Sequence, residues 1–322
     1  MDDFKISIAM TTFNGARFLE DQLLSLASQT RLPDEVVICD DVSTDDTENI
    51  VAQFSQSSPL TINFSKNSER LGVSRNFQKA INKCSGDLIL LSDQDDFWFS
   101  HKVSTIERLF IENPTVMVSL NDQEIAEEDL RPTGITTFGN SRGLGLGIIY
   151  SYGCCTAIRR CFLDFVLPFP PEPIAFDGWI HRVASALGVQ SVIEDSLQFF
   201  RRHEFNNSAS VVSQPKQTDL FTSFVEYRYA NPVASWLNEI NASVELVHRL
   251  HKHSDLVKKM GLYSRSMSQC DYERRRIKAL YERLCISKVS RVLRSILILN
   301  FYIKGKYEFF HGWKSAVKDL IR

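Results

Sequence analysis

The chain has 322 residues and a mass of 36.8 kDa, which is enough for one large domain or for two. Its 43% hydrophobic and 24% charged residues are ordinary for a soluble globular protein. The net charge of −2 is unevenly spread, because residues 249–322 carry +12 and the first 248 residues carry −14. This asymmetry favours an acidic body followed by a basic tail suited to an anionic surface.

Strand and helix signals alternate along the first 120 residues. We expect strands at residues 4–10, 36–39, 60–64, 88–91 and 116–120. Amphipathic spacing predicts helices at residues 18–27, 47–54, 76–84 and 103–111. Alternation of this kind is typical of an α/β fold, in which a mostly parallel sheet is covered by helices on both faces.

The second half of the chain divides into three stretches. Residues 121–150 contain many glycines and predict either a mobile segment over a cleft or a plain surface loop. Residues 151–205 return to compact patterning, with strands at 154–158 and 191–194 and a helix at 179–187. From residue 218 onward the pattern is helical and increasingly basic. We therefore expect a body over residues 1–214 and a basic helical region over residues 215–322.

The cysteines and the chain ends indicate the compartment. Seven cysteines without C-x-x-C spacing indicate neither a zinc site nor a disulfide framework, and reduced thiols are the simplest account. The N-terminus is acidic and unlike a signal peptide, and the apolar tract at residues 295–303 is too short to span a bilayer. The expected location is cytoplasmic, with a peripheral position on the inner face of the cytoplasmic membrane as an option.

Polar clusters follow the predicted strands at residues 11–15, 40–41 and 92–96. In parallel sheets, ligands bind at the carboxyl ends of the strands. The last cluster places three carboxylates within four residues, and these repel one another unless a cation or water compensates them. The cluster therefore predicts either a divalent cation that grips a diphosphate or a solvated acidic turn.

Taken in order, a set of motifs resembles the family 2 glycosyltransferases, which have the GT-A fold. The resemblance covers about residues 4–210 and is nearest to the subgroup that transfers rhamnose or related sugars in bacterial surface polysaccharide (O-antigen) assembly. The matching pieces are Thr12-Phe13-Asn14-Gly15, Cys39-Asp40-Asp41, Leu71-Gly72 with Asn76-Phe77, Asp93-Gln94-Asp95-Asp96 (the D-x-D motif), Phe176-Asp177-Gly178-Trp179, and Arg201-x-His203 with Asn206-Asn207.

The chain departs from the usual family pattern at a few positions. Phe13 stands where a tyrosine is common, and Val42 stands where a glycine usually follows the paired aspartates. Phe176 and Gly178 flank Asp177 where a histidine and an aromatic residue often occur, which removes a potential partner of that carboxylate.

The resemblance implies a role for each motif. It assigns Asp177 as the general base, since an inverting reaction needs a carboxylate near the acceptor hydroxyl. It implies that the nucleotide is bound by Thr12, Phe13, Asn14, Asp40, Asp41, Arg75, Asn76 and Asp93. The alternative for Asp40 and Asp41 is a helix cap, and the alternative for Arg75 is an exposed residue at a helix start.

The remaining roles concern the metal, the diphosphate and the acceptor. Asp93, Asp95 and His203 are the expected ligands of Mn²⁺ or Mg²⁺, and Arg201 with His203 would contact the diphosphate. A structural role is the equal alternative for His203. Asp96 could instead cap the following helix. Gly153 and Trp179 would line the acceptor side, although Trp179 could equally be a buried residue at a helix start.

The basic tail suggests a partner. Apolar residues recur at three- and four-residue steps between arginines and lysines over residues 274–296, and aromatic residues follow up to residue 313. This pattern predicts a helix at an anionic membrane surface, or a helical extension packed on the body or on a second subunit as a homodimer.

The resulting hypothesis is an inverting, metal-dependent glycosyltransferase of the hexosyltransferase type that uses a nucleotide-diphospho-sugar and a saccharide or lipid-linked acceptor. A nucleotidyltransferase that makes a nucleotide-sugar is a rival, but residues 11–16 lack the lysine and the glycines of its usual loop. A nucleic-acid-binding protein is the rival from another class. The acidic body and the lack of a recognisable module argue against any nucleic-acid partner.

Overall fold

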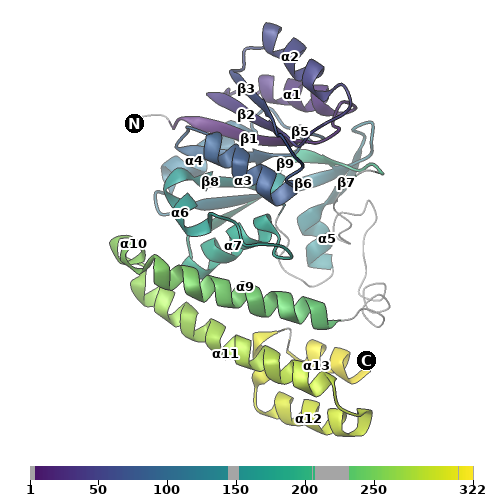
Figure 1. Cartoon of the computed structure of the whole chain (residues 1–322), viewed down its shortest axis with the longest axis vertical. Helices are drawn as coiled ribbons and strands as arrows, with labels where there is room; N and C mark the ends of the chain where they lie inside the picture. The colour runs from purple at the N-terminus through teal and green to yellow at the C-terminus, as the bar shows by residue number, and fades with distance from the viewer. Residues whose placement is uncertain (1–3, 144–151, 205, 207–231, 311, 322) are drawn as a thin grey trace. The chain divides into compact units, whose positions relative to one another are not determined.

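The computed structural model describes residues 4–143, 152–204, 206, 232–310 and 312–321. The chain folds into two compact units, residues 1–218 and residues 219–322 (Figure 1). Each unit is described by itself below.

One sheet forms the centre of the first unit, and nine strands belong to it within the described residues. The strands are β1 (Ile6–Thr12), β2 (Glu35–Asp40), β3 (Ile62–Lys66), β4 (Leu88–Ser92), β5 (Phe97–Trp98), β6 (Val118–Ala126), β7 (Pro132–Thr136), β8 (Thr156–Arg159) and β9 (Gln190–Arg201). Their order is β3-β2-β1-β4-β8-β6-β9-β5, and β7 pairs with β6.

The expected class, a mostly parallel sheet with flanking helices, is confirmed. The four strands β3, β2, β1 and β4 are mutually parallel, and β6 and β9 are parallel to each other. Strand β8 runs antiparallel to both β4 and β6, so β4 and β6 run in the same direction. Six of the nine described strands therefore share one direction, and only β5, β7 and β8 oppose it.

Helices cover both faces of this sheet (Figure 1). Those of the first unit are α1 (Leu19–Ala27), α2 (Thr47–Ser57), α3 (Val73–Lys83), α4 (Lys102–Glu112), α5 (Thr137–Gly143), α6 (Leu163–Val166) and α7 (Phe176–Leu187), with short 3₁₀ turns η1 (Gly153–Cys155) and η2 (Arg160–Phe162). Alternate apolar residues of β1, β2 and β4 pack with α1, α2 and α4 in one buried cluster, while α3 lies against β1 and β2. Burial on both faces explains why these strands read as continuous apolar runs.

The stretch from 121 to 150 differs from the expected loop. Strand β6 continues to Ala126, and β7 and α5 follow before residues 144–151, which lie outside the described residues. Strand β6 was predicted too short because its second half is polar, yet Asn121, Asp122 and Gln123 are buried. Hydrogen bonds compensate Asp122, for example from the Thr137 hydroxyl at 2.9 Å, whereas Asn121 Oδ1 and Gln123 Nε2 are buried without a hydrogen-bond partner among the described residues. A buried polar strand of this kind lacks the hydrophobic pattern on which strand prediction depends.

The second unit is helical in its described residues. It contains α9 (Pro232–Lys252), α10 (Ser254–Lys259), α11 (Tyr263–Ser287), α12 (Arg291–Ile303), the 3₁₀ turn η4 (Lys306–Phe309) and α13 (Trp313–Ile321). Two small buried clusters join these helices, one around Ile298 and Phe301 and one around Trp236 and Leu280.

An ion pair is buried in this second unit. Arg283 donates two hydrogen bonds, of 2.7 and 2.9 Å, to the Asp319 carboxylate, and the Tyr307 hydroxyl donates a third at 2.7 Å. The guanidinium also lies 4.5 Å from the Trp236 ring centroid. Arg283, one of the arginines in the expected surface pattern, thus belongs to the core of the unit.

Across the described segments, we find no helix that combines the length and the apolar character needed to cross a membrane.

Candidate active site

The strand register brings the predicted polar clusters to one edge of the sheet. Thr12 is opposite Asp40 in the β1–β2 pair, and Met10 is opposite Ser92 in the β1–β4 pair. The residues that follow these strands, from 13, 41 and 93 onward, therefore leave the sheet side by side. The site begins at this edge, where the carboxyl ends of the parallel strands meet.

Asp40 is fully buried and is already hydrogen-bonded on both oxygens. It accepts from the Thr12 hydroxyl at 2.8 Å and from the backbone N–H and hydroxyl of Ser43. Asn14 joins the same loops, because its side-chain oxygen accepts from the Thr44 N–H at 2.9 Å. In this structure Asp40 thus ties the loop after β2 to β1.

Asp41 faces a different loop and is also buried. It accepts from the backbone N–H groups of Leu71 and Gly72, at 2.7 and 2.9 Å, and from the Asn67 amide. Burial works against the charge of Asp41, but these hydrogen bonds and nearby Arg70 outweigh it and lower the pKa of the carboxyl. The carboxylate therefore stays ionised and holds the start of α3.

Phe13 lies between two residues that sequence reasoning did not assign. The Gln94 side-chain amide accepts a hydrogen bond from the Phe13 N–H at 2.9 Å and donates one to the Phe13 carbonyl at 3.1 Å. The Arg70 guanidinium lies 3.1 Å from the Phe13 ring centroid. A Cβ on Gly15 would fall 2.3 Å from the Gln94 Oε1, so any other residue there would displace the Gln94 amide from Phe13. The position of Gln94 inside the acidic motif was the only sequence signal for it.

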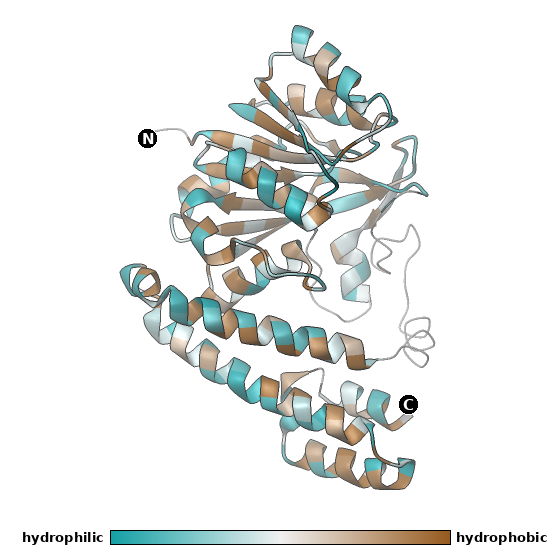
Figure 2. Cartoon of the chain, in the orientation of Figure 1, coloured by the Kyte–Doolittle hydropathy of each residue, from teal (hydrophilic) through white to brown (hydrophobic). Residues whose placement is uncertain are grey.

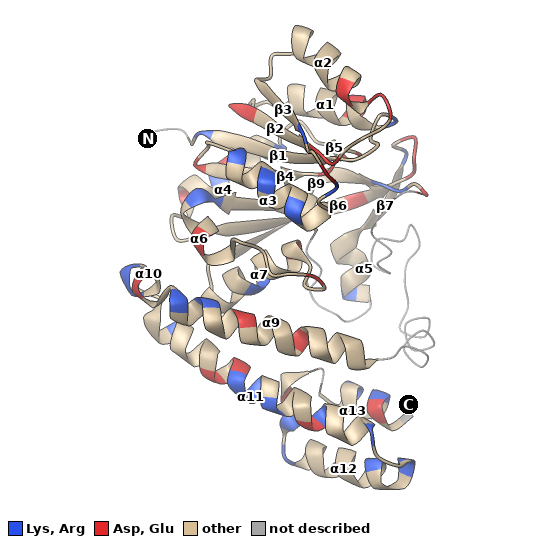
Figure 3. Ribbon diagram, viewed as in Figure 1, with Lys and Arg blue, Asp and Glu red and all other residues tan. Residues whose placement is uncertain are grey.

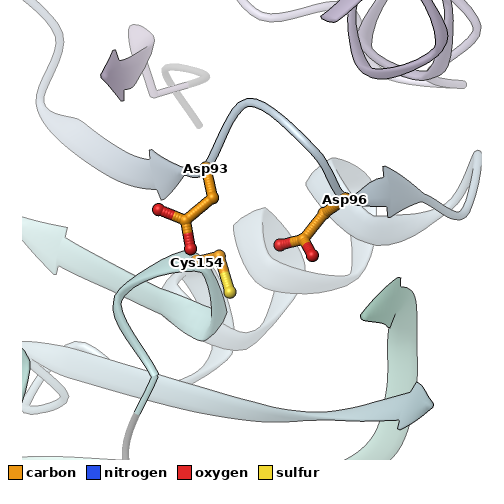
Figure 4. Close-up of side chains that lie close together, drawn as sticks. All are labelled: Asp93, Asp96 and Cys154. Carbon is orange, nitrogen blue, oxygen red and sulfur yellow. The ribbon is translucent and has the colours of Figure 1, made fainter. Parts of the chain in front are cut away.

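Two aspartates and a thiol gather after β4 (Figure 4). Ligand atoms of Asp93, Asp96 and Cys154 all lie within 4.8 Å of one another. Asp96 is almost fully buried, and its Oδ1 has no hydrogen-bond partner among the described residues. Burial, together with the charge of Asp95, raises the pKa of Asp93 to about 7, and it raises the pKa of Asp96 well above its usual range. These carboxyls are thus poised to take up a proton or a cation.

A buried lysine, which the sequence analysis missed, lies behind this cluster. Lys102 donates to the Cys154 carbonyl at 2.8 Å and to the Gln198 amide oxygen, and its ammonium lies 3.7 Å from the Trp98 ring centroid. Gln198 in turn donates to Asp96 at 2.9 Å. Burial lowers the pKa of Lys102 to about 8 despite the nearby carboxylates. Spacing gave no hint of it, because a lysine at a helix start normally reads as a solvated residue.

Asp95 and His203, two of the expected metal ligands, are in direct contact. His203 Nε2 lies 2.9 Å from Asp95 Oδ2 and 3.0 Å from the Asn206 amide nitrogen. The Asn206 amide is oriented by the His203 N–H and by the Arg201 carbonyl. One nitrogen cannot donate to the carboxylate and also accept from the amide. In either tautomer, His203 Nε2 therefore satisfies only one of these two neighbours.

Arg201 is buried beneath the pair and holds the loop of Asp95. Its guanidinium donates to the carbonyls of Asp95 and Glu128, at 3.1 and 2.9 Å, and to the Asp21 carboxylate at 2.7 Å. All three guanidinium nitrogens are thereby hydrogen-bonded within the protein, so Arg201 holds the loop of Asp95 in place.

Asp177 approaches the cluster from α7. It is partly exposed in the first turn, and its Oδ1 accepts from the Gly178 N–H at 2.7 Å. Burial raises the pKa of Asp177 in spite of hydrogen bonds from Gly178 and Gly153, and its charge in turn raises the pKa of Asp93. A Cβ on Gly153 would fall 2.7 Å from the Phe176 ring, so only glycine allows η1 to pack this closely beside Asp177.

Of three further predicted site residues, two are buried and one is exposed. Trp179 is fully buried, and its indole N–H donates to the Val166 carbonyl at 3.0 Å. The prediction that it lines the acceptor side is therefore wrong, and the alternative of a buried residue at a helix start is confirmed. Asn76 is buried and donates to the Cys39 carbonyl at 2.8 Å. Arg75 is exposed in the first turn of α3, on the side where that helix begins beside Asp41.

All seven cysteines are free thiols, in agreement with the expectation of no disulfides. Hydrogen bonding to Cys155 and burial raise the pKa of the Cys154 thiol, which makes it a poor nucleophile. The chemistry of the site therefore rests on carboxylates and one imidazole, a donor set that fits Mg²⁺ or Mn²⁺.

Comparison with known proteins gives a family. The sequence model described as glycosyl transferase family 2 matches residues 7–166. An uncharacterized glycosyltransferase of Nostoc sp. is 27% identical over 228 residues, 67% of this chain and 70% of that protein. The dTDP-rhamnosyl transferase RfbG of Shigella flexneri is 37% identical over 98 residues, 29% of this chain and 34% of that protein. WfgD of Escherichia coli, a UDP-Glc:α-D-GlcNAc-diphosphoundecaprenol β-1,3-glucosyltransferase, is 28% identical over 176 residues, 52% of this chain and 66% of that protein.

Solved structures agree on the fold. TarS 1–349 of S. aureus in complex with UDP-GlcNAc has a TM-score of 0.59 at 20% identity, covering 98% of this chain and 89% of that one. The mannosyltransferase PcManGT of Pyrobaculum calidifontis, in complex with GDP-Man and Mn²⁺, has a TM-score of 0.50 at 15% identity, covering 85% and 88%. The expected GT-A type of α/β fold is confirmed. By its family match, its relatives and its fold, this chain belongs to the family 2 glycosyltransferases.

Proposed function

We propose that this glycosyltransferase moves a hexose or deoxyhexose, with inversion, from a nucleotide-diphospho-sugar to a saccharide carried on a lipid diphosphate, in bacterial surface polysaccharide synthesis. The names of two relatives support this choice, since RfbG is a dTDP-rhamnosyl transferase and WfgD acts on a diphosphoundecaprenol-linked sugar. Rhamnose is the first donor sugar to test. A cytoplasmic enzyme at the inner face of the membrane would meet such an acceptor.

The observation that carries the proposal is the meeting of three carboxyls and one imidazole at one edge of the sheet. Asp95 contacts His203, and Asp93 interacts with both Asp95 and Asp177. These residues come from the ends of β4 and β9 and from α7, three segments far apart in sequence. Burying several charged groups with few opposite charges destabilises a protein, so four such groups in one place favour a functional site over a structural one.

The metal and the nucleotide would be held by neighbouring groups. Asp93, Asp95 and His203 would bind Mn²⁺ or Mg²⁺, and Asp96 offers a further unpartnered oxygen. When bound, the metal would supply charge neutralisation to the departing diphosphate. Phe13 with Arg70, together with Thr12, Asn14, Asp40 and Asp41, would form the wall of the nucleobase site, and Arg75 would reach a phosphate.

Asp177 would act on the acceptor. It takes the proton of the acceptor hydroxyl as that oxygen bonds to the anomeric carbon and the bond from this carbon to the diphosphate breaks. Its raised pKa, caused by burial, makes the carboxylate a stronger base. Gly153, which packs against the Phe176 ring beside Asp177, would lie on the acceptor side.

Substitutions separate these roles. We expect Asp177→Asn to reduce transfer by about 10²–10⁴-fold while nucleotide binding persists, because only the general base is lost. Asp95→Asn should reduce both transfer and metal-dependent binding of the nucleotide. Asp164→Asn, at an exposed position in α6, is the matched control.

The measurement is transfer to a lipid-linked acceptor from dTDP-rhamnose or UDP-glucose, with and without Mn²⁺, alongside thermal-shift titration of the same nucleotides. A ligand at a hundredfold excess over its Kd should stabilise the protein by about 2.7 kcal/mol. Full activity in the presence of a chelator, or equal activity of both variants and the control, would refute the proposal.

A further inference from the structure

Helix α12 is apolar on two opposite faces. Ile298 and Phe301 point into the buried cluster of the second unit. Val292, Ile296, Leu299 and Ile303 recur at four-, three- and four-residue steps, which places them on one opposite face. These four side chains are between 59% and 78% exposed. A helix that is apolar all round normally has both faces covered, so the second face calls for a partner.

The charges around this apolar face are almost all of one sign. Residues 291–318 contain six basic residues and one acidic residue, Glu308. The basic residues of α12 and its C-terminal flank lie at the two ends of the helix, and the helix itself carries no acidic residue (Figure 3). Figure 2 shows the apolar character along most of its length. An apolar stripe bordered by lysine and arginine matches a bilayer with anionic headgroups.

Helix α13 has a second exposed apolar row. Trp313, Val317 and Leu320 follow at steps of four and three residues and are all exposed, whereas Ala316 packs with Ile298 of α12. Tryptophan is favoured at membrane interfaces because its ring is apolar and its N–H is polar. Both neighbouring helices thus leave apolar residues uncovered.

A pocket of about 690 Å³ lies between α11 and α12. Its wall combines apolar residues such as Ile277, Val289 and Leu297 with the ammonium groups of Lys278 and Lys304. The one acidic residue of the lining, Glu282, is paired with Lys306. An apolar wall with uncompensated positive charge is complementary to a phospholipid, which joins an acyl chain to an anionic headgroup.

We propose that the outward face of α12 docks on an anionic membrane surface. The helix has 13 residues and would lie in the plane of the interface, with Val292, Ile296, Leu299 and Ile303 inserted among the headgroups. Arg291 and Arg294 at one end, and Lys304 and Lys306 at the other, would contact lipid phosphates. The inference does not depend on the reaction that the first unit catalyses.

A second copy of the chain is a poorer occupant on electrostatic grounds. A twofold interface sets the same patch of both subunits face to face. Pairing two α12 helices would bring only arginines and lysines together at the ends, because α12 has no acidic residue to oppose them. Like charges in direct opposition are destabilising.

The test is flotation of the full chain with lipid vesicles, in the absence of a sugar donor. We expect binding to vesicles of phosphatidylcholine with one third phosphatidylglycerol, weaker binding as salt rises, and little binding to phosphatidylcholine alone. Ile296→Gln with Ile303→Gln should lower the partition coefficient at least tenfold. Leu237→Gln with Val244→Gln, at exposed apolar positions of α9, is the matched control and should change it less than twofold.

The charged residues allow a second, independent comparison. Arg291→Gln with Lys304→Gln should reduce binding to the anionic vesicles about 25-fold, because each basic residue near such a surface contributes about fivefold. Lys258→Gln with Lys259→Gln, on α10, should leave it nearly unchanged. Circular dichroism would confirm that every variant keeps its helices.

Several results would overturn the inference. Failure of the unaltered chain to float would do so, as would equal losses in the α12 variant and the α9 control. A lipid-free dimer, detected by light scattering and split by the Ile296 and Ile303 substitutions, would assign this face to a second copy. Because no transfer is measured, these outcomes leave the proposed glycosyl transfer untouched.

Discussion

At the scale of single residues, Val42 carries backbone strain next to the site. Its φ of 67° lies in the left-handed region, which is unfavourable for a β-branched side chain. The family resemblance places a glycine there, and the structure supplies the reason for that preference. Asn14, in the opposing loop, has a φ of 48° and is a residue type that tolerates this conformation better.

Replacing Val42 by glycine should therefore stabilise the first unit. The strain is of the order of 1–2 kcal/mol, and the extra chain entropy of glycine offsets about half of it, so we expect a gain of about 0.5–1 kcal/mol. Val192→Gly in β9, where φ is not positive, should instead destabilise the unit. Thermal unfolding of both variants measures the difference. A lower Tm for Val42→Gly than for the unaltered chain would contradict the strain argument.

At the scale of elements, the buried pair of Arg283 and Asp319 links α11 to α13. Both charges are removed from water, and the guanidinium is further enclosed by the rings of Trp236, Tyr307 and Phe310. Burial, together with the neighbouring Asp319, raises the pKa of Tyr307, so this hydroxyl remains a hydrogen-bond donor. The Asp319 carboxylate thus adds a buried ion pair to the apolar packing that holds α13.

Asp319→Asn should cost about 3–5 kcal/mol, because it leaves a buried guanidinium without a counter-charge. Asp271→Asn, which breaks the exposed pair with Arg274, should cost less than about 1 kcal/mol. Urea denaturation followed by the helical circular dichroism signal measures both. Similar midpoints for the two variants would show that the buried pair does not hold α13 in place.

In the helical region, the sequence predicted the helices and their basic charge but not the burial of Arg283. The helical, basic character of residues 232–321 was evident from spacing and charge. The sequence pattern ran through Arg283 and Ile296 as one amphipathic stretch, whereas the chain turns between α11 and α12 and buries Arg283. Which charged residues face solvent depends on Asp319, more than 30 positions away, and local periodicity contains no such information.

At the scale of the whole molecule, folding keeps one histidine neutral. His181 is buried in α7 with its Nε2 2.8 Å from the Thr156 hydroxyl, and burial lowers its pKa to about 3. In the unfolded chain its pKa is near 6.5. Between these two values the unfolded state binds one more proton than the folded state, so stability falls as the pH is lowered from about 6.5 towards 3.

The unfolding free energy of the first unit should accordingly fall by up to about 1.4 kcal/mol for each pH unit below 6.5 because of this residue alone. His181→Gln removes the titrating group, so its stability should decline less steeply below pH 6.5. The comparison is of slopes of unfolding free energy against pH, which is independent of any constant cost of the substitution. Parallel slopes for the two proteins would show that His181 is charged in the folded state.

The fold and the motifs followed from sequence because they depend on local signals. Buried parallel strands give unbroken apolar runs, polar residues follow where each run stops, and parallel pairing brings those ends to one edge. The alternation along residues 4–120 therefore determined the α/β class and the neighbourhood of Asp40, Asp41 and Asp93. The basic C-terminal region was likewise fixed by composition.

Only the tertiary structure decided which polar groups are left uncompensated. It enclosed Trp179, engaged both oxygens of Asp40, put the buried Lys102 beside Asp96, and left the outward face of α12 without a cover. Each of these outcomes depends on partners far apart in the chain, such as the return of β9 with His203 to Asp95. Burial and hydrogen bonding are properties of three-dimensional neighbours, and the order of residues along the chain does not specify them.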